Sequence, residues 1–158
     1  MAEEAFCPVS AETVFTIANN GILIFWLLLI VAPRWKGTDL LVHSMAVPVL
    51  IGLTYAWLIA RSFMGEGASG TSFFSLAGVM AFFTSPVAAT AGWIHYLVFD
   101  LFIGAWETRD AQRRSISHLA VIPCLIVTLL FGPIGLLLYL AMRAALRKGG
   151  WSLRETTA

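Results

Sequence analysis

The chain has 158 residues, of which 59% are hydrophobic and only 12% are charged, and its mean hydropathy is +0.83. Soluble domains carry about 25% charged residues, so the composition indicates one integral membrane domain over residues 1–158, with the lipid bilayer as its surroundings. The net charge is +1. No basic stripe is present, which excludes a nucleic-acid-binding protein.

The first span is predicted over about 12–32, the roughly 20 residues needed to cross about 30 Å of hydrocarbon. The acidic residues 1–7 lack the basic region that begins a signal peptide, so we expect this segment to remain as a membrane helix. A bacterial inner membrane or a thylakoid membrane fits best. Asn19 and Asn20 lie at its centre, where they are expected either to bond a neighbouring helix or to line a cavity.

A second span is predicted over about 39–63. The apolar stretch 73–83 is too short to cross a bilayer, and it predicts an interfacial or re-entrant helix. A third span is predicted over about 86–106, and the polar run 107–115 follows as a loop. A fourth span is predicted over about 117–146. Its length exceeds one crossing, so it should tilt, kink or project from the bilayer.

These segments predict an all-α membrane bundle of four transmembrane helices plus one short helix. On this topology the Lys and Arg residues divide five against five between the two sides, so the positive-inside rule gives no orientation. Gly-rich faces leave a homo-oligomer open, but no clean GxxxG stripe demands one.

The third span carries ionisable groups within an apolar run: His95, Asp100 and Glu107. Such groups cost roughly 2.5–3.5 kcal/mol each on insertion scales and are usually functional. Antiparallel spans bring the start of the second span, the end of the third and the start of the fourth to one side of the membrane. This convergence places His43 and His118 near the two carboxylates.

Helical geometry separates these groups into two faces. At 100° per residue, one narrow stripe holds Trp93, Asp100, Gly104 and Glu107. His95 points about 140° away from Asp100 and shares a face with Phe99 and Trp106. The two sets should therefore line different walls, or His95 should bond another helix.

Several kinds of chemistry fit these residues. A carboxyl or imidazole group in a low-dielectric pocket can act as a general acid or base near neutral pH. Histidine–carboxylate sets also suit iron or zinc, although no HxxxH, HExxH or ExxH spacing is present. The metal ligands would be His43, His95, His118 and Asp100. Transport is a further hypothesis, which the absence of an inverted repeat disfavours, and a purely structural role for each group remains the alternative.

The ligand predicted from composition is long and apolar. Eleven Phe, six Trp and several Gly residues can frame a groove for a flat hydrophobic molecule, although membrane helices commonly have this composition. The side chains predicted to contact such a ligand are Asn19, Asn20, Trp93, Tyr96, Phe99 and Trp106.

Four sequence segments, taken in their order along the chain, resemble those of a known family. The blocks are residues 93–104, 116–118, 123–125 and 131–137. Together they resemble the ABA4-like family of small four-helix membrane proteins, over about residues 13–143. The plant member is linked to neoxanthin formation, in which a violaxanthin epoxide opens to an allenic alcohol without net redox change. The resemblance therefore implies a carotenoid ligand and a reaction that needs a proton donor and a base.

The resemblance points to Asp100, His95 and His118 as candidate catalytic groups, and Glu107 joins them from the Asp100 stripe. A carboxylate would remove a proton from the polyene end, while an imidazolium or a second carboxyl group would protonate the epoxide oxygen. Two alternatives stay open, because bacterial relatives occur where neoxanthin is not made. One is metal-dependent oxidative cleavage of a carotenoid to retinal-like products, with iron or zinc as cofactor. The other is binding of a carotenoid or lipid without chemistry and without a cofactor.

Overall fold

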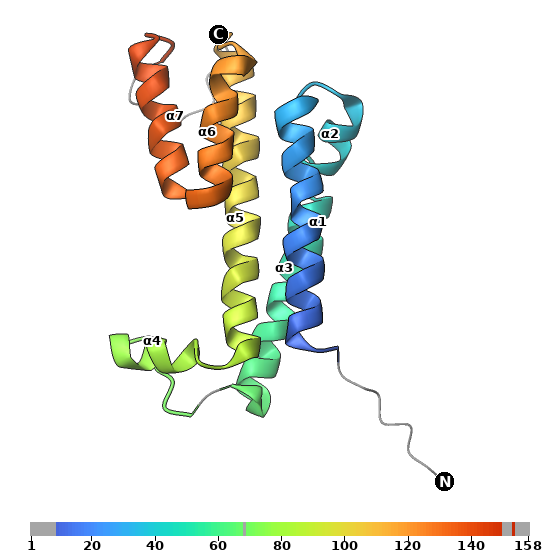
Figure 1. Ribbon diagram of the computed structural model, residues 1–158, viewed down its shortest axis with the longest axis vertical. Helices are drawn as coiled ribbons and strands as arrows, with labels where there is room; N and C mark the ends of the chain where they lie inside the picture. The colour runs from blue at the N-terminus through green and yellow to red at the C-terminus, as the bar shows by residue number, and fades with distance from the viewer. Residues whose placement is uncertain (1–8, 68, 150–152, 154–158) are drawn as a thin grey trace. The chain divides into compact units, whose positions relative to one another are not determined.

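The computed structural model describes residues 9–67, 69–149 and 153, and Figure 1 shows its helices. The acidic stretch 1–7 lies outside the described residues. Within them the chain forms helices and short connections and contains no strand. The helices are α1 (Ala11–Val31), α2 (Lys36–Leu41), α3 (Ala46–Arg61), a helical turn η1 (Ser62–Glu66), α4 (Leu76–Phe82), α5 (Pro86–Arg113), α6 (His118–Phe131) and α7 (Pro133–Ala145). The predicted all-α class is confirmed.

The chain divides into two compact units, and the long helices contribute to both. The first unit comprises Met1–Gly21 and Ile51–His95, and the second comprises Ile22–Leu50 and Tyr96–Ala158. His95 therefore belongs to the first unit, whereas Asp100 and Glu107 belong to the second.

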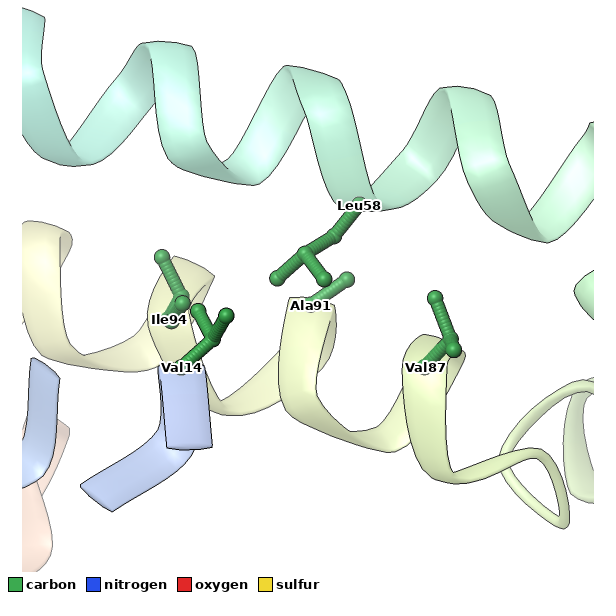
Figure 2. Packing of buried hydrophobic residues seen from close by; sticks show 5 residues of the cluster. All are labelled: Val14, Leu58, Val87, Ala91 and Ile94. Carbon is green, nitrogen blue, oxygen red and sulfur yellow. The ribbon is translucent and has the colours of Figure 1, made fainter. Parts of the chain in front are cut away.

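The first unit is held by a small apolar core from three helices. Val14 of α1 and Leu58 of α3 pack with Val87, Ala91 and Ile94 of α5 (Figure 2). The three α5 positions recur at a spacing of three and four residues, which puts them on one face of the helix. Ala91 is fully buried, and its small side chain leaves room for Leu58. This core is entirely apolar.

The short apolar segment expected over 73–83 is the helix α4. Ser75 begins it as an N-cap, and its hydroxyl accepts a hydrogen bond from the Gly78 amide at 3.1 Å. The helix has 7 residues, about 10 Å of length, so it cannot cross a membrane. The prediction of a short, non-spanning helix is confirmed.

The second unit contains a helical hairpin that was not expected. The predicted span 117–146 consists of α6 and α7, helices of 14 and 13 residues that pack against each other (Figure 1). The chain reverses at Gly132, whose φ of 47° and ψ of −102° leave helical geometry, and Pro133 begins α7 because its fixed φ suits the first helical position. Each helix is about 20 Å long, which is too short to cross about 30 Å of hydrocarbon.

The count of four transmembrane helices is therefore not confirmed. Three helical segments are long and apolar enough to cross a membrane: Ala11–Val31, Lys36–Glu66 and Pro86–Arg113. The first agrees with the predicted span 12–32. The second includes a short break between α2 and α3. The structure supports a membrane protein with three candidate spans and a hairpin of short apolar helices.

The prediction of a polar loop over 107–115 is also wrong. Helix α5 continues to Arg113, and within this stretch Glu107, Thr108 and Asp110 are buried, each with at most 2% of its surface exposed. The physical reason is the hairpin, because α6 and α7 supply hydrogen-bond donors to Glu107 and Asp110, while the Thr108 hydroxyl donates to the Gly104 carbonyl of α5 itself. The sequence suggests that these charged residues are exposed to solvent, but in the structure Glu107 and Asp110 are buried between α5 and the hairpin.

The hairpin also changes the distribution of positive charge. The Arg114 guanidinium donates to the backbone carbonyl of Lys148 at 3.1 Å, so the end of α7 returns to the end of α5. Among the described residues, the first unit contains one cation, Arg61, and the second unit contains the others: Arg34, Lys36, Arg109, Arg113, Arg114, Arg143, Arg147 and Lys148. The predicted five-against-five division depended on a fourth crossing, which the structure does not confirm.

Candidate active site

The second unit buries an aspartate at the turn of the hairpin. Asp100 has 8% of its surface exposed, and its carboxylate accepts a hydrogen bond from the Tyr96 hydroxyl, one helical turn earlier. Its Oδ2 atom is buried and has no hydrogen-bond partner among the described residues. Buried polar atoms are nearly always paired in native structures, so an unpaired one calls for an explanation.

Gly132 closes the other side of this carboxylate. A Cβ atom at this position would lie 2.7 Å from Asp100 Oδ1, and the φ of +47° is one that side-chain-bearing residues rarely adopt. Glycine is therefore required here for both conformation and space. Because α7 begins at this glycine, the positive end of its helix dipole lies beside the carboxylate.

Glu107 lies two turns further along α5 and is completely buried. The Thr128 hydroxyl of α6 lies 3.0 Å and 3.2 Å from the two carboxylate oxygens and donates to them. Gly135 of α7 packs directly on Thr128, with no room for a side chain. This close packing fixes the hydroxyl that faces Glu107.

Three of the four residues of the predicted stripe, Asp100, Gly104 and Glu107, share a face of α5 in the second unit, whereas Trp93 belongs to the first unit. A Cβ atom at Gly104 would lie 2.6 Å from the Trp26 ring and 3.5 Å from Leu125. Asp100 and Glu107 flank this glycine, and both face the α6–α7 hairpin. Neither carboxylate has a Lys or Arg partner within the described part of the chain. Two buried carboxylates without a cation thus share one face of a candidate membrane span.

A third carboxylate on α5 has a different environment. Asp110 accepts hydrogen bonds from Tyr139 at 2.7 Å, from Arg143 at 3.1 Å and from Arg114 at 2.8 Å. Two of these partners lie on α7, one turn apart. The network fastens the hairpin to the end of α5. Sequence reasoning missed it, although Asp110 with Arg114 and Tyr139 with Arg143 each have the spacing of four residues that puts two side chains on one helical face.

The three histidines contact three different partners. In the second unit, His118 Nε2 donates to the Ile30 carbonyl near the end of α1 at 2.8 Å, because a carbonyl can only accept. His43 Nδ1 lies 3.0 Å from the Arg109 guanidinium. In the first unit, the His95 and Tyr55 rings lie 5.6 Å apart. His43, His118 and the two carboxylates thus belong to one unit, but no hydrogen bond among the described residues joins the histidines to the carboxylates.

The predicted metal ligands do not form a metal-binding group where the structure describes them. No three His, Cys, Asp or Glu side chains among the described residues lie close enough together to hold an ion. Nitrogen atoms of His43 and His118 are already engaged, by Arg109 and by a backbone carbonyl. The donor set of the described residues therefore does not fit iron or zinc.

The predicted ligand-contacting residues have separate roles. Asn19 accepts a hydrogen bond from the Trp93 indole at 3.0 Å, which joins α1 to α5 in the first unit. Asn20 donates to the Thr16 carbonyl of its own helix at 2.9 Å. In the second unit Trp106 packs edge-on against Tyr139, and Phe99 is more than half exposed. Of the six, Tyr96 is the one in contact with Asp100 in the described structure.

Comparison with known proteins gives the family. The model of the ABA4-like family (ABA DEFICIENT 4-like) matches residues 13–139. The chain belongs to the ABA4-like family. The match covers Asp100, Glu107, Thr128 and the Gly132 turn, and it ends at Tyr139.

A plant relative agrees with this assignment. The chain is 28% identical over 140 residues to Protein ABA DEFICIENT 4, chloroplastic, from Arabidopsis thaliana. The alignment covers 85% of this chain and 62% of the relative, so the chain spans less than two thirds of the relative's length. No solved structure matches this chain.

Proposed function

We propose that this ABA4-like protein binds a carotenoid in the membrane and isomerises it by acid–base chemistry at Asp100. The observation that carries the proposal is the pair Asp100–Tyr96, a buried carboxylate without a cation that contacts a hydroxyl group. Ionisable groups kept inside membrane spans at this energetic cost mark functional sites by default. The family's link to neoxanthin formation supports a carotenoid as the substrate.

The proposed step is the opening of an epoxide next to a polyene. The Asp100 carboxylate removes a proton from the polyene carbon beside the epoxide-bearing carbon. The electron pair of that C–H bond forms a new carbon–carbon double bond, and the C–O bond of the epoxide breaks. Tyr96 gives its hydroxyl proton to the released oxygen, and the proton on Asp100 then returns to Tyr96. No atom and no electron is gained or lost, so the reaction is an isomerisation and leaves the pair as it began.

Glu107 has a supporting role in this proposal. Two helical turns, about 10 Å, separate it from Asp100, so it does not touch the same reacting atoms. Its buried carboxylate instead sets the electrostatic field along the face of α5. His118 donates to a carbonyl at the end of α1, and His95 belongs to the first unit, so the proposed step uses no imidazole.

The test uses pigment-producing cells. The full chain, Asp100→Asn and Asp39→Asn are expressed in cells that make violaxanthin and in cells that make β-carotene, and the pigments are separated and identified by chromatography, absorption and mass. We expect a new isomer from violaxanthin with the unchanged chain and at least about 100-fold less with Asp100→Asn, the scale of a lost general base. Asp39 is exposed, so its variant should behave as the unchanged chain.

Three other results would sink the proposal. Normal turnover by Asp100→Asn would remove Asp100 as the base. Coloured protein that returns its pigment unchanged would make the chain a binding protein. Shortened, retinal-like products would establish oxidative cleavage instead.

The Lys and Arg residues near the ends of α5 and α7 also support one orientation of the chain in the membrane. Cytoplasmic sides of membrane proteins carry the excess of Lys and Arg, so we propose that the ends of α5 and α7 face the cytoplasm, or the stroma in a plastid. Cysteines placed at Arg147 and at Ser69, in a chain whose native cysteines are serine, would be labelled in intact cells with an impermeant thiol reagent. Labelling at 69 and protection at 147 are expected, and the reverse pattern would overturn the orientation.

A further inference from the structure

A cavity of about 680 Å³ lies in the second unit, where the chain leaves α1 and where it passes from α5 to α6. This volume is within the range of small-molecule pockets. Two stretches of the chain line the cavity, residues 31–35 and several residues between 112 and 118. Gln112 lies more than three turns of α5, about 18 Å, beyond Asp100. The cavity is therefore separate from the candidate active site.

Hydrogen bonds between the two stretches hold the sides of the cavity together. The Gln112 side-chain amide donates to the Pro33 carbonyl at 3.2 Å. The His118 ring donates to the Ile30 carbonyl, which precedes the first lining residue, at 2.8 Å. Binding sites for small molecules are usually formed before the ligand arrives, and these two contacts give the cavity a fixed shape without one.

The polar groups of the wall favour an anion. Arg34 is exposed and has no hydrogen bond or ion pair with the described residues. Ser115 and Ser117 are also exposed, and their hydroxyl groups have no hydrogen-bond partner among the described residues. No Asp or Glu is found among the described residues of the wall. A guanidinium matches the geometry of a phosphate group and binds it through parallel hydrogen bonds.

An apolar strip on α1 leads to the same cavity. Ile24, Leu27 and Val31 are each more than half exposed, and their spacing of three and four residues puts them on one face of the helix. Val31 also belongs to the cavity wall. Trp35, a further wall residue, is more than half exposed, and tryptophan is enriched where a membrane meets water. A ligand that fits both features has an anionic end and an apolar chain.

We propose that this cavity binds the phosphate group of an anionic membrane lipid. Arg34 pairs with the phosphate, and the hydroxyl groups of Ser115 and Ser117 donate to its oxygens. An acyl chain of the lipid lies along the apolar strip of α1. Basic pockets between membrane helices bind lipid head groups in this way. This lipid site does not depend on the proposed reaction at Asp100.

The experiment measures lipid binding to the purified full chain by native mass spectrometry from detergent micelles. The probes are phosphatidylglycerol, which is anionic, and phosphatidylcholine with the same acyl chains, which is neutral overall. We expect one phosphatidylglycerol per chain to bind about fivefold more tightly than phosphatidylcholine, the effect of one cation at a membrane surface. Arg34→Gln should remove this preference. Equal affinities of the unchanged chain for the two lipids, or a preference that survives in Arg34→Gln, would overturn the proposal.

The matched control is Arg147→Gln, which removes the same charge. Arg147 is exposed in the second unit and lies outside the cavity wall, so this variant should bind both lipids as the unchanged chain does. An equal loss of preference in the two variants would show a diffuse attraction of charges and no site. Arg34→Gln should also melt at the same temperature as the unchanged chain when no lipid is added, because Arg34 has no partner among the described residues.

Inorganic phosphate distinguishes a lipid from a soluble ligand. The lipid site predicts that phosphatidylglycerol stays bound when inorganic phosphate is added in large excess, because the acyl chain contributes to binding. Displacement of the lipid by inorganic phosphate would make the ligand a soluble phosphate compound and would overturn the proposal.

Discussion

Two buried aspartates of the same helix have different surroundings, and the comparison distinguishes a carboxylate that joins helices from one that we propose takes part in a reaction. Asp110 and Asp100 both lie on α5 and both are buried. Asp110 is surrounded by two arginines and a tyrosine. Asp100 has a tyrosine, the glycine of the hairpin turn and an unpaired oxygen. The first environment neutralises a charge and joins helices, whereas the second leaves a carboxylate oxygen unpaired among the described residues, and we propose that this carboxylate reacts.

The largest expected loss of stability comes from the paired aspartate. Asp110→Asn leaves Arg143 buried, with 3% of its surface exposed, and without its anion. Removing one partner of a buried pair costs about 3–5 kcal/mol. We expect a loss of about 3 kcal/mol in the free energy of unfolding, measured by denaturing-detergent titration in mixed micelles. Asp39→Asn is the matched control, and a loss below about 1 kcal/mol would show that the network does not hold the hairpin.

The next largest effect is expected at the hairpin turn. Gly132→Ala puts a methyl group against the Asp100 carboxylate and forces a left-handed conformation on alanine. Such strain costs about 1–3 kcal/mol, and displacement of the carboxylate should also reduce turnover. Gly52→Ala is the control, because a Cβ atom at Gly52 meets nothing within 4 Å. Equal behaviour of the two variants would contradict the described turn.

The hydroxyl that faces Glu107 should have a moderate effect. Thr128→Val keeps the shape of the side chain but removes the donor to both carboxylate oxygens. Leaving a buried acceptor unsatisfied costs about 1–3 kcal/mol. In a double-mutant cycle with Glu107→Leu, which removes both acceptor oxygens, the two unfolding costs should not add, since both substitutions break one contact. Additive costs would mean that the contact contributes nothing.

The smallest effect is expected at His118, which the sequence suggested as a catalytic group. Its Nε2 donates to the Ile30 carbonyl, so His118→Phe should lose about 1 kcal/mol of stability with turnover per folded protein unchanged. Stability and product are measured on the same preparation. Product lost from a fully folded variant would return His118 to the catalytic set.

The carboxylate face could be predicted from the sequence because it depends on one helix. Regular helical geometry alone puts Asp100, Gly104 and Glu107 together, and the structure has them on the face toward the hairpin. The family could be recognised too, since its blocks lie along the chain in order.

The hairpin could not be predicted in the same way. The stretch 117–146 is apolar on both sides of Gly132 and Pro133, so hydropathy does not distinguish a kink from a reversal. The reversal is accompanied by a contact between residues far apart in the sequence, Asp110 with Arg143, and by the close approach of Gly135 to Thr128 across the turn. The partners of the histidines were hidden for the same reason, because a backbone carbonyl such as that of Ile30 leaves no sequence signal.

The most direct test compares Asp100→Asn with Asp110→Asn in one experiment. Product formed per mole of folded protein and the free energy of unfolding are both measured, with violaxanthin as substrate. The account predicts that Asp100→Asn loses at least about 100-fold in product and keeps its stability, while Asp110→Asn loses stability and keeps its turnover per folded protein. Normal turnover by Asp100→Asn, or a loss of product explained by its folded fraction alone, would contradict it.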